Sequence, residues 1–338
     1  MAWGTISVSD EPAGYDQAVW FGGGVRSSPV WLRCTAPDAL SNLVAVLELA
    51  ADRQLRYGAA TRRPLAATVR LVEDVLVAGD YYEAALAGTR EPIAIAAFAW
   101  PLLVQAGGLA QLAGARLELT ARGRAALAQP SYQTLGALWD RWLTSVSRDE
   151  LARVESIKGQ RRPSTLTSVP GRRAAVAAGL TAVEPGAWTD VDVLLRVMAT
   201  QPRPLVVARS LRALWRLYLT DSYHGSLGHA GSAAGNVLAA RYALCVLFEY
   251  AATMGVIDVA YTGPAGARDD YRGLWGTGDL AWLSRYDGLV AVRVNELGAA
   301  ILHDPGALSG LSLPVPRRPA GQSAGQPVSQ PASRSASR

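Results

Sequence analysis

The sequence predicts a mainly helical protein with small β ribbons, built from two modules of similar design. The chain writes nearly the same phrase twice, as "RLELTARGRAAL" ending at Leu127 and "AVRVNELGAAIL" ending at Leu302. Half of its residues are hydrophobic and 18% are charged, which is enough apolar material for packed cores. At 338 residues it also exceeds the usual size of one domain, so two domains are expected.

Each copy of the phrase predicts a strand, a sharp corner and a short helix. Apolar residues alternate before the corner, which is the period of a half-buried strand. Thr120 in the first copy and Asn295 in the second then stand where a helix N-cap is expected, because their side-chain oxygens accept bonds from free backbone N–H groups. The copies align on Gly123 and Gly298, and their alternating residues are Leu117, Leu119, Val292 and Val294.

Residues 38–130 form the first predicted module. Asp38 is the N-cap candidate of a first helix in "DALSNLVAVLELAA", a short strand candidate "RQLRYG" follows, and Pro64 stands at the expected first position of a second helix. "EPIAIAAFAWPLLVQAGG" predicts a third helix, and two strands joined by a tight turn at Gly114 complete the unit.

Residues 188–313 are expected to repeat this order. Helices are predicted from Thr189 or Asp190, in "SLRALWRLYLTD" and in "GNVLAARYALCVLFEYAATMG". The strands "VIDVAYTGP" and "GLVAVRVN" then pair across a long insertion, residues 263–287. A loop of that length in a compact domain usually has a function or folds back on the body.

The remaining segments have distinct compositions. Residues 1–37 predict a loop-rich N-terminal arm packed by its tryptophans, and residues 131–187 predict a basic, structured, partly helical connector. Residues 314–338 are rich in Pro, Ser, Arg and Gln and predict a disordered tail. Cys34 and Cys245 are far apart, so we expect buried thiols without a disulfide framework.

The N-terminus lacks a basic region followed by an apolar core, so no signal peptide is predicted. Prolines and glycines interrupt the longest apolar stretch, and no membrane span is predicted. We therefore expect a cytoplasmic protein without a membrane partner.

The order helix, strand, helix, helix, strand, turn, strand, with the two phrases quoted above, resembles bacterial winged-helix modules, a variant of the helix-turn-helix. The resemblance covers about residues 38–128 and 188–303, and the first stretch is similar, more weakly, to helicase-associated winged-helix regions. It implies binding of double-stranded DNA through the third helix and the wing, or binding of protein partners. The 263–287 insertion would be an enlarged second wing.

Two basic clusters are candidates for phosphate contact. The net charge of +5 and a pI near 9.4 favour polyanionic partners, although a G- and C-rich coding sequence would give the same arginine bias. Each cluster is therefore weighed against an ordinary solvated face, and the third helix of the first module contains no basic residue. The candidates are Lys158, Arg161, Arg162, Arg172 and Arg173 in the connector, and Arg209, Arg212 and Arg216 on one predicted helical face.

No residue pattern predicts an enzyme, a cofactor or a metal. "DSYHGSLGHAG" groups Asp221, His224 and His229, but its glycines predict a turn rather than a fixed set of ligands. The insertion alternates acidic residues with arginines, which predicts mutual pairing instead of a nuclease centre. The acidic residues are Asp269, Asp270, Asp279 and Asp287, and the expected pairs are Asp270 with Arg272 or Arg268 and Asp287 with Arg285.

The sequence thus favours a non-catalytic protein that binds double-stranded DNA, as a regulator or as the DNA-engaging subunit of a larger complex. The alternative is a protein-interaction scaffold whose modules hold partner subunits. Ten tryptophans against three phenylalanines favour that alternative, because Trp often anchors protein interfaces.

Overall fold

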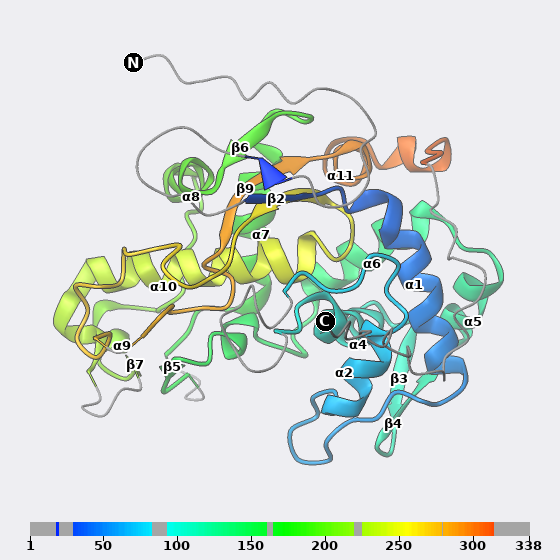
Figure 1. Ribbon diagram of the computed structural model, residues 1–338, viewed down its shortest axis with the longest axis horizontal. Helices are drawn as coiled ribbons and strands as arrows, with labels where there is room; N and C mark the ends of the chain where they lie inside the picture. Colours follow the sequence, from blue (N-terminus) through cyan, green and yellow to red (C-terminus); the bar gives the residue numbers. More distant parts are fainter. Residues whose placement is uncertain are drawn as a thin grey trace, which may run out of the picture.

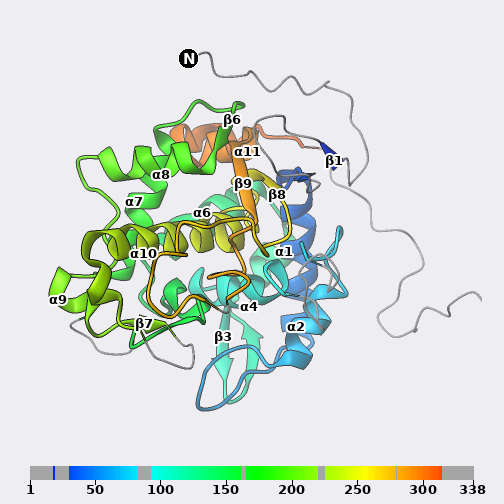
Figure 2. The same ribbon diagram turned by 60° about the vertical axis from the view of Figure 1, so that its left-hand side comes forward.

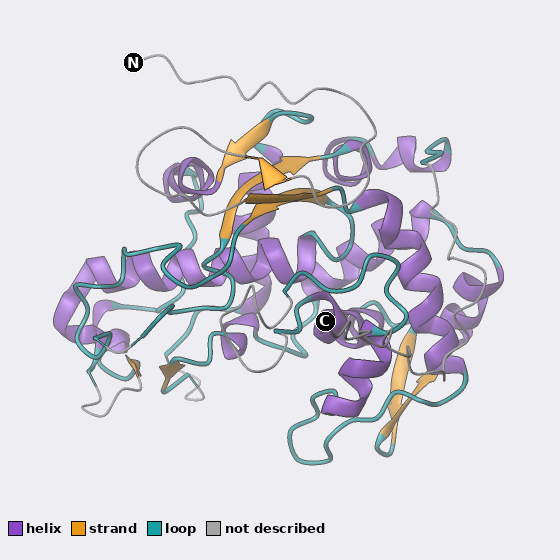
Figure 3. Ribbon diagram, viewed as in Figure 1, coloured by secondary structure: helices purple, strands orange, loops and turns teal. Residues whose placement is uncertain are grey.

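The computed structural model describes residues 18–19, 30–82, 93–160, 165–219, 225–278 and 280–313. Helices predominate in it, and the described strands form one five-stranded sheet and two two-stranded ribbons (Figure 3). At this level the expected mainly helical fold with small β elements is confirmed.

The first half follows the predicted order of elements. An isolated bridge between Arg56 and Arg116 places the predicted short strand beside the closing hairpin. Pro64 precedes the second helix, and Gly114, with φ of +62°, makes the hairpin turn. The elements are α1 (Ala36–Ala51), α2 (Ala66–Glu73), α4 (Ala96–Ala106), β3 (Ala110–Ala113), β4 (Arg116–Leu119) and α5 (Ala121–Ala128).

The connector is structured, as expected. Its first helix buries one apolar face, formed by Leu135, Leu138, Trp139 and Trp142. The elements are α6 (Tyr132–Thr144), the short helix η1 (Glu150–Arg153), β5 (Ile157–Lys158) and α7 (Val169–Thr181).

One helix of the second half is shorter than the sequence predicts. The helix expected over 210–221 is a single turn, because the chain leaves it after Trp215 and enters a strand that pairs with β5. The elements are β6 (Trp188–Asp190), α8 (Val191–Thr200), α9 (Leu211–Leu214), β7 (Tyr218–Leu219), η2 (Leu227–Ala230), α10 (Gly231–Cys245), the π-helical turn η3 (Val246–Ala251), β8 (Ile257–Tyr261), β9 (Leu289–Val294), α11 (Glu296–His303) and η4 (Pro305–Ser309).

The second hairpin lies inside a larger sheet. The strand order is β1 (Ala18–Val19), β2 (Val30–Arg33), β8, β9, β6, with antiparallel neighbours (Figure 1). The prediction of a loop-rich arm over 1–37 is therefore wrong for 30–33, which form an apolar strand, and for 36–37, which begin α1. Residues 1–17 and 20–29, and the predicted tail at 314–338, lie outside the described residues.

The repeated phrase forms the same corner in both halves. Thr120 Oγ1 accepts a hydrogen bond from Gly123 N at 3.1 Å, and Asn295 Oδ1 accepts one from Gly298 N at 2.9 Å. A Cβ added at either glycine would overlap a backbone carbonyl, that of Leu109 at the first and that of Val256 at the second. Each short helix therefore needs glycine where it crosses the start of its hairpin.

Buried apolar residues form one continuous core that includes side chains from both halves and from the connector. Helix α4 is almost entirely buried, and η3 is buried throughout. Asp258 on β8 joins the halves directly: its Oδ1 accepts bonds from Thr35 N, before α1, and from Asn295 Nδ2, both at 2.9 Å. Cys245 is buried as expected, whereas Cys34 is exposed, which corrects the prediction for that thiol.

One helical stretch among the described residues, Leu227–Ala251, is long and apolar enough to cross a membrane. The sequence analysis predicted no membrane span and did not identify this stretch as a candidate. Two thirds of its most apolar window (67%) is buried inside the protein, and it carries the buried ionic residues Arg241 and Glu249. This is the pattern of a core helix.

Candidate functional site

Arg172 and Arg173 do not form part of an exposed basic patch. Both belong to α7, are at most 2% exposed and point into the protein. The Arg172 guanidinium binds both carboxylate oxygens of Asp149 at 2.6 and 3.0 Å, and Arg173 Nε donates to Glu150 at 2.8 Å. The prediction that these two arginines contact phosphates is therefore wrong, because buried charges with carboxylate partners are not available to a ligand.

Glu150 and Arg153 of η1 are buried, and both form hydrogen bonds with other buried side chains. Glu150 accepts bonds from Arg173 and, at 2.9 Å, from Tyr242 Oη. Arg153 Nε donates to both oxygens of Glu249 at 2.9 Å, and Tyr286 Oη also bonds to Glu249.

The pKa shifts in this network follow from burial and pairing. Burial raises the pKa of Glu150, against the opposing effect of the Arg173 charge. Burial acts to lower the pKa of Arg153, but Glu249 and Tyr286 hold it well above its usual range. These contacts hold η1 against α7, α10 and η3.

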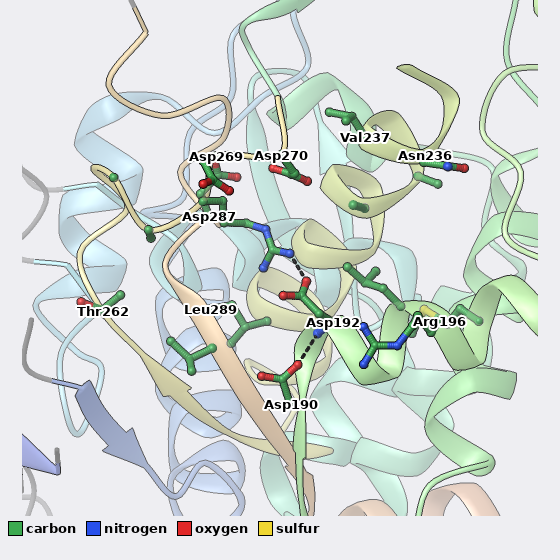
Figure 4. Close-up of a pocket in the computed structure, with 18 of the residues that line it drawn as sticks. Asp190, Asp192, Arg196, Asn236, Val237, Thr262, Asp269, Asp270, Asp287 and Leu289 are labelled. Atoms are coloured by element: carbon green, nitrogen blue, oxygen red, sulfur yellow. Dashed lines mark hydrogen bonds and ion pairs between the residues drawn. The ribbon is translucent and has the colours of Figure 1, made fainter. Parts of the chain in front are cut away.

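A cleft of about 1280 Å³ opens between α8, the first turns of α10 and the 263–287 insertion. Figure 4 shows Asp190, Asp192 and Arg196 on the α8 side, and Asp269, Asp270 and Asp287 on the side of the insertion. Val237 of α10 and Leu289 of β9 supply part of its apolar lining.

Most of the carboxylates in this cleft cap a helix or pair with an arginine. Asp190 caps α8 by accepting from Asp192 N at 2.8 Å, and Asp192 pairs with Arg268 of the insertion. Asp270 binds Arg241 at 2.5 and 2.6 Å. Burial acts to raise the pKa of Asp270, but these hydrogen bonds and the Arg241 charge hold it below its usual value.

The pairing predicted inside the insertion is therefore wrong. Asp270 and Asp287 both bind Arg241 of α10, while Arg285 binds Glu155 of the connector at 3.0 Å. The reason is burial, since Arg241 is inaccessible and needs both carboxylates for compensation. The described residues contain no group of three or more Asp, Glu, His or Cys side chains placed to hold a metal ion; Asp221, His224 and Asp279 lie outside them.

Exposed aromatic side chains gather around α9. Trp215 is 55% exposed and Trp275 is 61% exposed, and the exposed His229 ring lies between them. The His229 centroid is 4.8 Å from that of Trp215, edge to face, and 5.5 Å from that of Trp275, with the two planes nearly parallel at 27°. Tyr218 of β7 is exposed beside them.

The same region carries four of the predicted cations. Lys158 is paired with Tyr218 across β5 and β7, and the backbone of Gly159 touches that of Arg216. Arg209, Arg212 and Arg216 are all exposed, although they do not share the long helical face that was predicted. We call this set the α9 surface: Lys158, Arg209, Arg212, Trp215, Arg216, Tyr218, His229 and Trp275. Arg161 and Arg162 lie outside the described residues.

Two glycines shape this surface. A Cβ at Gly225 would overlap Trp275, and one at Gly228 would overlap Trp215, so both indoles lie directly on the backbone of one turn. The segment that was weighed as a metal loop is thus, in its described part, the base of an aromatic cluster. The sequence did not predict Trp215 and Trp275 as site residues; the glycines at 225 and 228, which leave room for rings, were the available signal.

Figures 1 and 2 both place α9 and β7 at one end of α10, away from the β3–β4 hairpin. Comparison of the chain with protein-family models, with curated proteins and with solved structures finds no match.

Proposed function

We propose that this protein is a non-catalytic DNA-binding protein that contacts double-stranded DNA through the α9 surface. The observation that carries the proposal is the gathering of four exposed cations, Lys158, Arg209, Arg212 and Arg216, around α9. The segments that form most of this surface, 156–160, 205–219 and 225–235, contain no acidic residue. A surface of this charge attracts phosphates and releases their counterions.

We also propose that the chain contains two winged-helix modules. The first would span α1 to α5. The second would begin at α7 rather than at residue 188, because β6 then occupies the place of the short strand: it pairs with β9 as Arg56 bridges to Arg116 in the first half. Helices α8 and α10, with strands β8 and β9, complete the same order.

The third helices are not the contact surface in this proposal. Helix α4 is buried in the core, and α10 is exposed only in its first turns. A helix that reads the major groove must present several polar side chains to solvent. DNA contact is therefore assigned to the surface beside α9, where cations are exposed.

The test is a titration of the full-length protein with random-sequence duplex at several salt concentrations. A triple variant, Lys158→Gln, Arg212→Gln and Arg216→Gln, should weaken binding at low salt. It should also reduce the salt slope by about 0.9 for each phosphate contact that is lost. The matched control replaces three exposed arginines of the first half, Arg56, Arg70 and Arg122, with Gln. Equal slopes for both variants and for the wild type would contradict the proposal.

A protein-interaction scaffold is the second candidate. It is favoured by two exposed aliphatic residues in the 205–219 segment that also carries Trp215, namely Leu211 at 64% and Val206 at 50% exposure. Exposed apolar residues gathered in one region mark protein interfaces. Under this alternative, Trp215→Ala would abolish capture of a defined partner, and neutralising Lys158, Arg212 and Arg216 would leave that capture intact.

A further inference from the structure

We infer that Trp215, His229 and Trp275 form a stacking platform for unpaired bases, so that DNA with a single-stranded stretch binds in preference to a fully paired duplex. The inference rests on the proposed function and deepens it, because it names the form of DNA that the α9 surface selects.

The platform is built from three separate segments. Trp215 follows α9, His229 lies on η2, and Trp275 comes from the insertion between β8 and β9. Leu227 N donates to Leu217 O at 2.9 Å, and Ser226 Oγ donates to Trp215 O at 3.2 Å. The backbone beneath the rings is therefore held by hydrogen bonds.

The rings remain accessible although they are packed together. Trp215 and Trp275 are each more than half exposed as residues, although burial is the usual outcome for Trp in a folded protein. His229 separates the two indoles and stacks on only one of them. Accessible aromatic faces take up unstacked bases without regard to sequence, since every base has a π face.

A paired duplex cannot use such a platform without losing its own base stacking. Bases in an overhang or a gap are already unstacked, so they gain the contact at little cost. Arg212 lies on α9 three residues before Trp215, and Lys158 pairs with Tyr218 across β5 and β7, so exposed cations on neighbouring elements can meet the backbone of the same strand. Aromatic faces beside cations, with no acidic residue in segments 156–160, 205–219 and 225–235, match this ligand better than they match an apolar peptide.

The experiment compares three probes on the full-length protein: a blunt duplex, the same duplex with a thymidine overhang, and the same duplex with an overhang of abasic units. The thymidine overhang should bind roughly 5- to 100-fold more tightly than the blunt duplex, and the abasic overhang should gain much less. Trp215→Ala and Trp275→Ala should each remove most of the gain, which is taken for every variant as the ratio of its affinities for the thymidine-overhang duplex and the blunt duplex. Trp188→Ala, on β6, serves as the control.

Tryptophan fluorescence gives a second measurement. Stacking should quench emission when the thymidine overhang binds, and the quench should shrink in the Trp215→Ala and Trp275→Ala variants. Equal affinity for all three probes, with no effect of either substitution, would overturn the inference while leaving the proposed function standing. Failure of every probe to bind would overturn both.

Discussion

The two closing hairpins share their base and differ at their tips and in their surroundings. In both, a cap residue and a glycine fix a short helix against the start of the first strand. The β3–β4 hairpin has a tight turn at Gly114. Its partner outside the hairpin is Arg56, which forms an isolated β-bridge with Arg116. The β8–β9 hairpin continues into the long insertion and forms the centre of the five-stranded sheet. The corner is thus a reusable unit, and each tip is adapted to its position in the molecule.

The helices that lead into the hairpins show the same contrast. Their ends match bond for bond: Leu109 N donates to Val104 O, and Val256 N donates to Ala251 O, both at 2.9 Å. This alignment places Leu102 of α4 opposite Glu249 of η3. One helix is held by apolar packing at that position, and the other by an ion pair with Arg153.

The largest expected effect breaks that ion pair. Glu249→Ala should lower the free energy of unfolding by about 3–5 kcal/mol, because it removes the buried carboxylate that pairs with the Arg153 charge. Denaturant unfolding measures the change. The double variant Arg153→Met and Glu249→Leu should recover most of the loss, since matched apolar side chains can replace a buried pair. A Glu249→Ala protein as stable as the wild type would show that the network contributes little.

Alanine at the corner glycines tests whether the two bases are equivalent. Gly123→Ala and Gly298→Ala should each cost about 1–3 kcal/mol, because the added methyl group meets a backbone carbonyl that cannot move independently. Thermal or denaturant unfolding of the two variants gives the comparison. A loss of stability in only one of the two variants would show that the two corners are not equivalent.

The insertion of the second hairpin should give it a pH dependence that the first lacks. The pKa of Asp270 is below its unfolded value of about 3.9, so its stabilising contribution is present at neutral pH and is lost as pH falls through the folded pKa. Asp270→Asn should therefore be less stable than the wild type near neutral pH, and the difference should shrink on acidification. Urea unfolding at several pH values measures this, and a difference that stays constant with pH would contradict it.

The smallest expected effect concerns a glycine without a close neighbour. Gly235 lies inside α10, and a Cβ there meets nothing within 4 Å. Gly235→Ala should raise the free energy of unfolding by about 0.5–1 kcal/mol, because alanine loses less backbone entropy in a helix. A destabilised variant would mean that this part of α10 needs glycine, as the corners do.

The sequence predicted what local patterns encode. Periodicity located α1 and α6, alternation located both hairpins, and the repeated phrase predicted the two corners; the N-cap expected at Asp38 was wrong, because α1 begins at Ala36 after Thr35. Sequence-based prediction failed where the structure around a residue depends on a partner that is distant along the chain. Nothing near Arg172 and Arg173 in an alanine-rich helix indicates burial, because their carboxylates come from Asp149 and Glu150, 23 positions earlier. The aromatic rings on the α9 surface likewise come from separate segments that only the fold brings together.

The contact between Asp258 and Thr35 has a consequence for how the chain is made. The two residues are 223 positions apart, and Asp258 accepts the Thr35 N–H that precedes the first helix. During synthesis this N-terminal segment leaves the ribosome long before its carboxylate partner does. The hydrogen bond before α1 therefore cannot form until residue 258 has left the ribosome, and we expect it to be among the later contacts made in folding.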